Sequence, residues 1–410
     1  MNTSVYIAKR YLLSTKKMHA VNIISGISML GVFIGSAALI IILSVFNGLE
    51  KVILSMYNNF TPELKIEPKY GKAFSPDNPV LQKLKQDNRI FSYTEVLQER
   101  ALLRYGDRQV IATVKGVSDD FLKNKQLDST IINGSFTISA GGEATAVVGA
   151  VLQGSLGVNV HDHLTSLQVY SPNKNSSVSS INPADEFTVR YIYPAGIFSV
   201  QQEFDDLLIV PLGFMRGLLS EPTDVSSVEL NFKKGTNVLA VQKDLEDQLD
   251  KRKFTVKNRY EQNTLLYKTL HVEKWAVFAI LSFVLLIATF NIIGSLTMLV
   301  IDKKKDIAIL TSLGAGKSLI QGIFFFEGML ISLIGCVGGI IIGLIFCLLQ
   351  QKYGFITMGG DLTIVNAYPV AFKASDFILV FLTVASIAVV ASGISARLSV
   401  KGLSDFKQDL

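Results

Sequence analysis

Residues 275–301 read WAVFAILSFVLLIATFNIIGSLTMLVI, a run of 27 residues without Asp, Glu, Lys or Arg. An α-helix needs about 20 predominantly apolar residues to cross the hydrocarbon core of a bilayer. Only helices and closed barrels can pair all their backbone polar groups there. Similar uncharged stretches occupy residues 20–49, 328–351 and 377–396. The sequence therefore predicts four membrane-spanning helices, at residues 21–46, 275–301, 320–350 and 376–397.

The composition of the chain agrees with a membrane protein. Apolar residues make up 49% of the 410 residues and charged residues 18%, whereas a soluble chain carries about 25% charge. The mean hydropathy is +0.38. Cys336 and Cys347 are the only cysteines, and at about 1.5 Å per residue along one helix they lie too far apart to form a disulfide. A disulfide scaffold is excluded, and the mild net charge gives no indication of a nucleic-acid partner.

Lys and Arg residues near the spans indicate the orientation, because cytoplasmic loops carry an excess of them. Basic residues cluster before the first span, between spans two and three, and after span four, whereas the loop between spans three and four has only Lys352 and Lys373. Both termini are therefore expected in the cytoplasm. The first span is too long for the apolar region of a signal peptide, about 7–15 residues, so it is expected to remain as an anchor.

These expectations divide the chain into nine segments. They are a cytoplasmic amphipathic segment (1–20), the first span (21–46), an extracytoplasmic domain (47–274), the second span (275–301), a cytoplasmic loop (302–318), the third span (320–350), a short outer loop (351–375), the fourth span (376–397) and a cytoplasmic tail (398–410).

The extracytoplasmic domain begins and ends alike. A strand-like alternation at residues 63–67 precedes a helical pattern at 79–85, and a second alternation at 227–232 precedes a helical pattern at 238–249. The two ends, about 60–110 and 225–260, are expected to pair into one α+β subdomain. Short apolar runs broken by Gly, Asn and Pro predict a β-rich insert at about 110–225. Helical patterns beside the spans predict stalks at both ends of the domain.

Three stretches together resemble a known family. They are residues 7–12 (IAKRYL) with 43–50 (LSVFNGLE), residues 290–300 (FNIIGSLTMLV), and residues 302–315 (DKKKDIAILTSLGA). With the order of one span, a large outer domain and three spans, they resemble FtsX/MacB-type ABC transporter permeases, and within these the LolC/LolE-type subunits of lipoprotein-releasing LolCDE systems. The resemblance implies an α-helical membrane protein with four transmembrane helices plus an α+β extracytoplasmic domain, a MacB-like periplasmic core with a β-rich insert.

The resemblance also implies a function. Two such subunits, identical or homologous, would pair in the lipids of a bacterial inner membrane on a separate LolD-like ABC ATPase. They would extract lipoprotein cargo from the outer leaflet and pass it to a LolA-like periplasmic carrier by mechanotransmission. The chain itself would be a non-catalytic subunit without a cofactor or a metal. A MacB-like exporter of peptides or drugs, and an FtsX-like signalling module that controls a cell-wall hydrolase, are the alternative functions.

The loop between spans two and three is the expected ATPase-coupling element. The resemblance implies a coupling helix from Asp306 to Ala315, with an apolar face of Ile307, Leu310 and Leu313 and with Gly314 as its end. The pattern alone equally allows a basic loop that only sets topology. The GAGKS sequence at 314–318 imitates a phosphate-binding loop, but Thr311 stands where that motif needs glycine. ATP binding at this motif is therefore rejected, and a partner is expected to hydrolyse ATP.

Small and polar residues within the spans suggest helix contacts. Glycines recur four apart, a spacing that allows close helix approach in lipid, either between subunits or within one bundle; they are Gly31, Gly35, Gly335, Gly339 and Gly343. Glu327 stands among apolar residues, where a carboxylate is costly, and a structural contact is favoured over proton transfer.

Cargo and carrier sites follow only from the resemblance. Apolar residues of the first and second spans would line the lipoprotein cavity, although plain packing is the alternative for each; the candidates are Met29, Phe33, Leu43, Phe46, Phe290 and Met298. A polar loop at 171–184 occupies the place of a carrier-recruiting segment, with candidates Pro172, Asn173, Lys174 and Pro183. By composition alone this loop is a turn. His161 and His163 lack a clear third metal ligand, so a surface turn is expected there.

Overall fold

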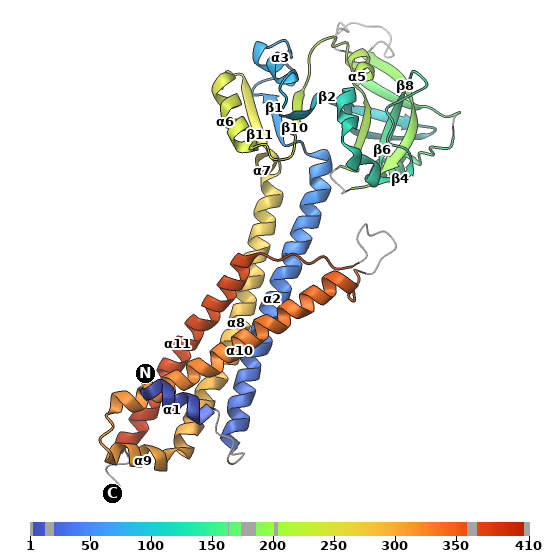
Figure 1. The fold of residues 1–410 in the computed structure, drawn as a ribbon. Coiled ribbons are helices and arrows are strands. Elements are labelled where there is room, and N and C mark those ends of the chain that lie inside the picture. Colours follow the sequence, from blue (N-terminus) through green and yellow to red (C-terminus); the bar gives the residue numbers. More distant parts are fainter. Residues whose placement is uncertain are drawn as a thin grey trace. The chain divides into compact units, whose positions relative to one another are not determined.

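The computed structural model describes residues 3–12, 20–162, 164–173, 186–200, 204–358 and 367–405. Two compact units divide the chain (Figure 1). The helical unit comprises Met1–Val52 and Lys268–Leu410, and the sheet unit comprises Ile53–Tyr267.

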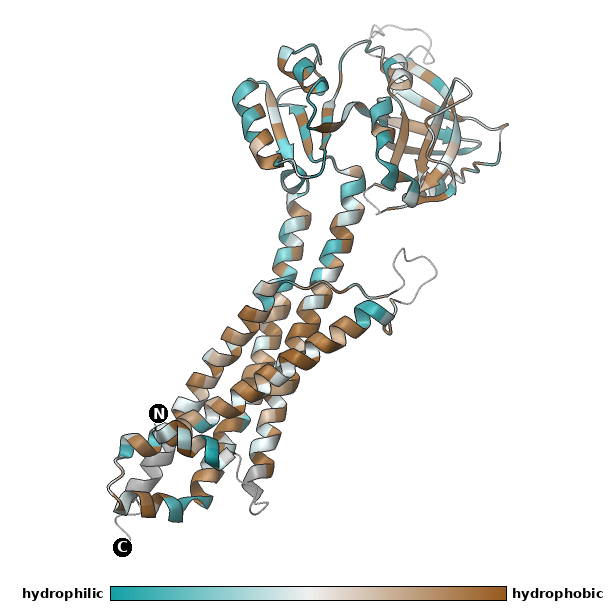
Figure 2. Ribbon diagram, viewed as in Figure 1, coloured by the Kyte–Doolittle hydropathy of each residue, from teal (hydrophilic) through white to brown (hydrophobic). Residues whose placement is uncertain are grey.

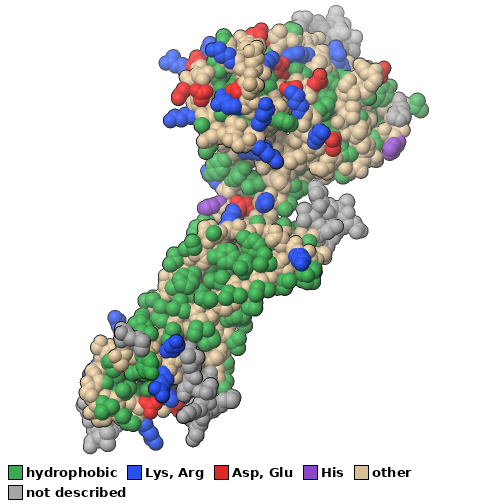
Figure 3. Space-filling model, in the orientation of Figure 1, with side chains coloured by type: hydrophobic (Ala, Val, Ile, Leu, Met, Phe, Trp, Pro, Cys, Tyr) green, Lys and Arg blue, Asp and Glu red, His purple; other side chains and the backbone are tan. Residues whose placement is uncertain are grey.

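Within the described ranges, the helical unit is built from two short and four long helices. The short ones are α1 (Thr3–Leu12) and α9 (Lys304–Ser312), and the long ones are α2 (Ala20–Phe60), α8 (Thr264–Asp302), α10 (Lys317–Tyr353) and α11 (Ala374–Asp405). Among the described residues, these four long helices are long and apolar enough to cross a membrane. Figure 2 shows their apolar stretches, and in Figure 3 hydrophobic side chains cover the visible face of the bundle while charged side chains gather at the end near α9. The predicted four-span fold is confirmed.

The long helices exceed the spans expected from hydropathy because nothing in the sequence breaks them at the membrane boundary. Helix α2 continues to Phe60, and the Thr61–Pro62 pair ends it, since a residue before proline disfavours the helical conformation. Helix α8 begins at Thr264, shortly after the short helix α7 (Arg259–Gln262). Asn258 and Glu261 form a capping box at the N-terminus of α7.

Apolar side chains from all four long helices form one core of the helical unit. Val32, Leu39 and Leu43 of α2 pack with residues of the other three helices, namely Leu285, Ile292 and Leu296 of α8, Cys336 of α10, and Val380 and Val384 of α11. Cys336 and Cys347 are both buried, free thiols.

The sheet unit contains eleven strands among its described residues, in the order β11-β1-β10-β2-β3-β9-β6-β8-β4, with β5 paired to β6 and β7 paired to β2 and β8. The strands are β1 (Leu64–Pro68), β2 (Ile90–Tyr105), β3 (Arg108–Val117), β4 (Ile131–Gly134), β5 (Ser139–Ala140), β6 (Glu143–Gly149), β7 (Leu167–Pro172), β8 (Phe187–Phe198), β9 (Leu207–Pro211), β10 (Ser227–Phe232) and β11 (Phe254–Asn258). Its other α-helices are α3 (Pro79–Lys85), α4 (Ala150–Leu156), α5 (Leu212–Leu219) and α6 (Val238–Gln248).

Strands β11, β1, β10 and β2 form an antiparallel sheet covered by α3 and α6. The chain order is β1-α3-β2 followed later by β10-α6-β11, and β1 lies between β10 and β11. The two β-α-β units therefore interleave as in a ferredoxin-like fold. Leu64 and Ile66 of β1, Leu81 of α3 and Leu245 of α6 lie in its core. We call this part the split lobe.

The second part of the sheet unit is a closed ring of six strands. Strand β2 pairs with β3, β3 with β9, β9 with β6, β6 with β8, β8 with β7, and β7 again with β2. Closure leaves no free edge in this ring. Leu103, Val114, Val148, Leu167 and Leu208 belong to one buried core, which fills the interior. We call this part the barrel lobe.

Strand β2 belongs to both lobes. Its first half pairs with β10, as at Glu95 opposite Val228, and its second half pairs with β3 and β7, as at Leu102 opposite Ile111 and Tyr170. The split subdomain was expected to end near residue 110, but Leu97 already lies in the barrel core. The boundary lies inside β2, because one uninterrupted strand passes from one core to the other.

Candidate functional site

Helix α9 is the coupling-helix candidate, and its inner side is fixed to the bundle. Ile307 is 2% exposed and packs with Leu299 and Val300 of α8 and with Ile320 and Phe324 of α10. Ile307 is therefore committed to the core of its own chain. It anchors α9 rather than offering its side chain to another protein.

The opposite side of α9 is open. Ile309 is 59% exposed and Leu313 is 80% exposed, while Leu310 is half-buried. Leu313 lies just past the helix end at Ser312, and Gly314 adopts φ +94° there. The Ala315 N–H donates to the Leu310 carbonyl over 3.0 Å, which satisfies an end carbonyl as glycine-terminated helices do. The free apolar surface thus consists of Ile309 and Leu313.

The helix begins in a charged cluster. The Lys303 Nζ lies 3.8 Å from an Asp306 carboxylate oxygen and 5.5 Å from the ring centroid of Tyr11 in α1. Burial, followed by the carboxylates of Asp306 and Glu327, raises the pKa of Tyr11. Helix α1, expected only as an amphipathic cytoplasmic segment, thus brings Tyr11 close to Lys303 before α9, and its Ser4 lies against Gly322 of α10.

The five predicted glycines all face another helix of the same chain. A Cβ added at Gly31 would lie 3.6 Å from the Ala288 Cβ of α8, and one at Gly35 would lie 2.6 Å from Leu285. On α10, a Cβ at Gly335 would lie 2.8 Å from the Met29 carbonyl oxygen of α2. Gly339 faces Ser36 and Gly343 faces Ile40. Helix α2 therefore lies in close contact with α8 and α10, as small residues in lipid permit.

A polar cluster ties three of the long helices together at the other end of the bundle. The Asn47 Nδ2 of α2 donates to Asp376 Oδ2 of α11 over 2.7 Å. The Lys274 Nζ of α8 donates to Asn47 Oδ1 over 2.9 Å and to both Asp376 oxygens over 3.1 Å. Asp376 is 6% exposed. This cluster was not predicted from the sequence, although Lys274 and Asp376 flank the second and fourth spans.

Glu327 is buried within α10, at 1% exposure, and its Oε2 has no hydrogen-bond partner among the described residues. The nearby Gly328 packs against Ser392 of α11. The structure thus places this acid in the interior of the bundle.

The six cargo candidates are divided among different environments. Leu43 is 1% exposed in the bundle core. Met29, Phe33 and Phe46 are half-buried. The Phe33 ring packs against Gly338 of α10, where an added Cβ would lie 3.1 Å from it. Phe290 and Met298 of α8 are 55% and 43% exposed. Leu43 and Phe33 therefore contribute to packing within the chain, whereas Phe290 and Met298 are open to an external apolar partner.

Two of the carrier-loop candidates lie at the base of the hairpin formed by β7 and β8. Pro172 is opposite Phe187, and the Asn173 N–H donates to the Glu186 carbonyl over 2.8 Å. Lys174 and Pro183 lie outside the described residues. The hairpin shows apolar residues to the outside of the barrel: Phe187 is 44%, Tyr191 63% and Tyr193 42% exposed.

The remaining motifs are assigned no chemistry. His161 is described and lies in a turn, while His163 lies outside the described residues. The described part of the chain contains no group of three or more His, Cys, Asp or Glu residues arranged to hold a metal ion. Helix α9 precedes Gly314 and helix α10 follows Gly316, so the strand that a phosphate-binding loop requires is not in that place.

Comparison with known proteins places this architecture in a family. A model of the MacB-like periplasmic core domain matches residues 25–248, more than half of the chain. A model of the FtsX-like permease C-terminal domain matches residues 278–402. The chain belongs to the FtsX/MacB-type ABC transporter permeases.

Individual relatives of this permease cover nearly its whole length. It is 25% identical to the lipoprotein-releasing system transmembrane protein LolC of Xylella fastidiosa, over 95% of this chain and 94% of that protein. It is 25% identical to the lipoprotein-releasing system transmembrane protein LolE of Haemophilus influenzae, over 96% and 95%. The crystal structure of the periplasmic region of MacB from Actinobacillus actinomycetemcomitans overlaps 52% of this chain at 12% identity, with a TM-score of 0.36.

Helix packing in this permease can be tested at Gly339. We expect Gly339→Leu to destabilise the bundle by about 2 kcal/mol, the typical effect of overpacking, because a Cβ there would overlap Ser36 and the Phe33 carbonyl. The measurement is the thermal midpoint of the detergent-purified protein. It is determined from the loss of the monodisperse peak in size-exclusion chromatography after heating.

The matched control for this measurement is Gly294→Leu. Gly294 lies on α8, and a Cβ there meets no other atom within 4 Å. Equal midpoints for the two variants would contradict the close approach of α2 and α10.

Proposed function

We propose that this chain is the permease subunit of an ABC transporter that releases lipoproteins from the bacterial inner membrane. The observation that carries the proposal is the match to LolC and LolE over at least 94% of both chains, which includes the span, the domain and the three following spans. The chain works as a pair of identical or homologous subunits on a separate ABC ATPase. It extracts lipoproteins from the outer leaflet, hands them to a periplasmic carrier, and contributes no catalytic group of its own.

The proposed topology puts both termini and α9 in the cytoplasm and the sheet unit in the periplasm. Lys303, Lys304 and Lys305 stand between the second and third spans, and such clusters remain on the cytoplasmic side. Helix α9 then meets the ATPase, while the polar cluster of Asn47, Lys274 and Asp376 lies at the periplasmic ends of the spans.

Depletion of the chain tests the proposed function in cells. We expect lipoproteins of the outer membrane to accumulate in the inner membrane, because their extraction is the step that stops. Membrane fractionation followed by lipoprotein immunoblotting measures this. Normal lipoprotein sorting together with altered drug tolerance would instead support a MacB-like exporter and reject the proposal.

The proposed ATPase contact centres on the exposed side of α9. Ile309 and Leu313 are its most exposed large apolar residues, and the buried Ile307 transmits force because it is fixed to α8 and α10. Motion of α9 therefore moves the ends of two spans. Leu310, half-buried, lies at the border of the two sides.

A charge at Leu313 tests this contact. We expect Leu313→Asp to reduce the amount of ATPase that co-purifies with the permease at least tenfold, since the carboxylate would have to be buried in an apolar contact. Leu313→Met is the matched control and should retain the ATPase. Recovery of the intact complex with Leu313→Asp after detergent purification would remove α9 from the proposed interface.

The proposed carrier contact lies on the outer side of the β7–β8 hairpin. Residues in register on β3, β2, β7 and β8 form a row on this outer side, namely Ile111, Leu102, Tyr170 and Val189. The exposed Tyr191 lies beside this row. Exposed aromatic residues often supply much of the binding energy at protein interfaces. A periplasmic carrier would dock here, beside the end of the hairpin at Pro172 and Asn173.

Substitution of Tyr191 tests the carrier contact. We expect Tyr191→Asp to weaken carrier capture about tenfold, equivalent to about 1.4 kcal/mol, in a pull-down by the purified permease. Leu164→Asp is the control, because Leu164 is 93% exposed but precedes β7 in the chain and lies outside the hairpin. Equal capture by Tyr191→Asp and the parent protein would place the carrier elsewhere.

A further inference from the structure

A charged cavity of about 330 Å³ lies between the split lobe and the barrel lobe of the sheet unit. One wall is the face of the split lobe opposite its apolar core, with Lys65 and Glu67 of β1, Glu229 of β10 and Lys257 of β11. The other wall is the outside of the barrel, including Lys115 of β3. The volume is in the range of small-ligand sites.

Strand register explains why charges meet in this cavity. Leu64 and Ile66 of β1 point into the apolar core, so the alternating residues Lys65 and Glu67 point to the opposite face. Lys65 is directly opposite Glu229 on one side and directly opposite Lys257 on the other. Two lysines in directly opposite positions repel each other.

Glu67 relieves part of this repulsion. Its carboxylate oxygens lie 2.7 Å from the Lys65 Nζ and 2.7 Å from the Lys257 Nζ. Burial alone would raise the pKa of Glu67, but the hydrogen bonds from Lys257 and Lys65 bring the pKa below its usual value. One carboxylate is thus shared by two ammonium groups.

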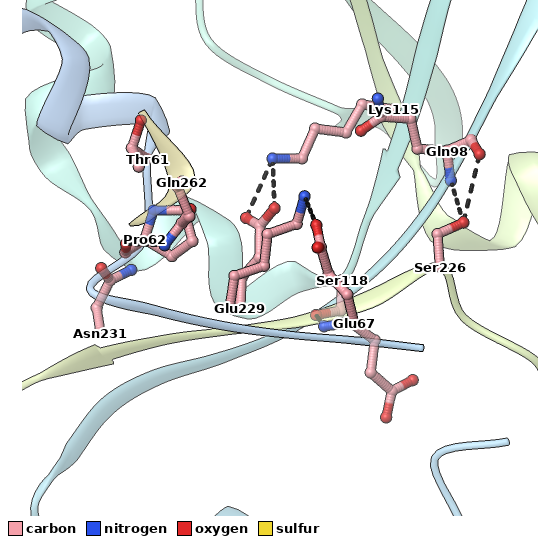
Figure 4. Close-up of polar contacts among 12 residues, drawn as sticks. Thr61, Pro62, Glu67, Gln98, Lys115, Ser118, Ser226, Glu229, Asn231 and Gln262 are labelled. Atoms are coloured by element: carbon pink, nitrogen blue, oxygen red, sulfur yellow. Dashed lines mark hydrogen bonds and ion pairs between the residues drawn. The ribbon is translucent and has the colours of Figure 1, made fainter. Parts of the chain in front are cut away.

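The second carboxylate of the cavity, that of Glu229, accepts hydrogen bonds from Lys115 at both of its oxygens. The Lys115 Nζ lies 2.8 and 3.0 Å from the two oxygens of Glu229 (Figure 4). Both side chains are almost completely buried, at 7% and 6% exposure. Loss of either partner would leave the other charge buried and unpaired, and both oxygens of Glu229 already accept hydrogen bonds from Lys115.

The cavity therefore holds three ammonium groups and two carboxylates, and it carries one positive charge in excess. Neutral hydrogen-bonding side chains complete its polar wall, among them Gln98, Thr113 and Gln262. Lys65 and Lys257 remain partly accessible, at 26% and 39% exposure, so a solute can reach them.

We propose that this cavity binds a small oxyanion of the phosphate type, which bridges Lys65 and Lys257. The anion supplies the negative charge that the two opposed lysines share only through Glu67. The same chemistry is offered by free inorganic phosphate and by the phosphate of a glycerophospholipid headgroup. This site goes beyond the proposed lipoprotein-releasing function and does not depend on it.

The bound anion would also affect the end of α2. Phe60, the last residue of that helix, and the following Thr61 and Pro62 line the same cavity. Arg259 already donates to the Thr61 carbonyl over 3.1 Å. An occupied cavity would link this helix end to β1 and β11 and stabilise the sheet unit.

Calorimetric titration of the purified full-length chain in lipid nanodiscs tests the proposal, with inorganic phosphate as the probe. We expect saturable binding of one phosphate per chain and a higher thermal midpoint in its presence. Lys257→Gln and Lys65→Gln should each weaken binding at least tenfold while keeping the ligand-free thermal midpoint of the parent. Lys251→Gln removes the same charge from a surface lysine paired with Asp247 and should bind as the parent does.

A parallel titration with glycerol 3-phosphate distinguishes the two sources. Tighter binding of glycerol 3-phosphate than of phosphate assigns a lipid headgroup, and equal or weaker binding assigns the free anion. The proposal is overturned if neither compound binds saturably, or if the Lys257 and Lys65 variants bind as well as the Lys251 variant. None of these results depends on lipoprotein sorting.

Discussion

The close approach of α2 to its neighbours is the constraint on which the helical unit depends. Lipid gives little hydrophobic drive for helices to associate, so contact must come from packing of small residues. Gly335, Gly339 and Gly343 present a surface without side chains to α2, and Gly31 and Gly35 present one to α8. The Ser36 hydroxyl donates a hydrogen bond to the Val32 carbonyl over 2.7 Å. It therefore adds no unpaired polar group to this contact.

The anchoring of α9 to α8 and α10 gives this short helix a mechanical role in the proposed function. A rigid bundle can transmit a push at α9 only if the side chain that receives it is fixed, and Ile307 is fixed against α8 and α10. The exposed Ile309 and Leu313 are then free for a partner. A helix with one anchored and one open side suits the transmission of force better than a mobile basic loop.

Much of this fold could be predicted from local sequence patterns. Hydropathy located the four spans, because twenty apolar residues leave a helix as the only single-chain solution in lipid. Alternation located strands such as β1, whose Leu64 and Ile66 are buried while Lys65 and Glu67 are not. Closure of the barrel was not predictable in this way, because it depends on β2 pairing with β7, some 65 residues later, and periodicity within a strand says nothing about its partner.

The candidate functional residues also differ in whether a local sequence pattern could identify them. Asp306 to Ala315 could be picked out because motif and position lie in one continuous segment, yet which of Ile307 and Leu313 faces the bundle depends on packing with α10. The cluster of Asn47, Lys274 and Asp376 joins residues that are at least 102 positions apart in the sequence, and the opposed Lys65 and Lys257 are 192 positions apart. A charge that looks like ordinary solvated surface in the sequence becomes a constraint only when the fold sets a like charge opposite it. In the described part of this permease, the fold brings like charges together where the two lobes of the sheet unit meet, and opposite charges together where three helices meet.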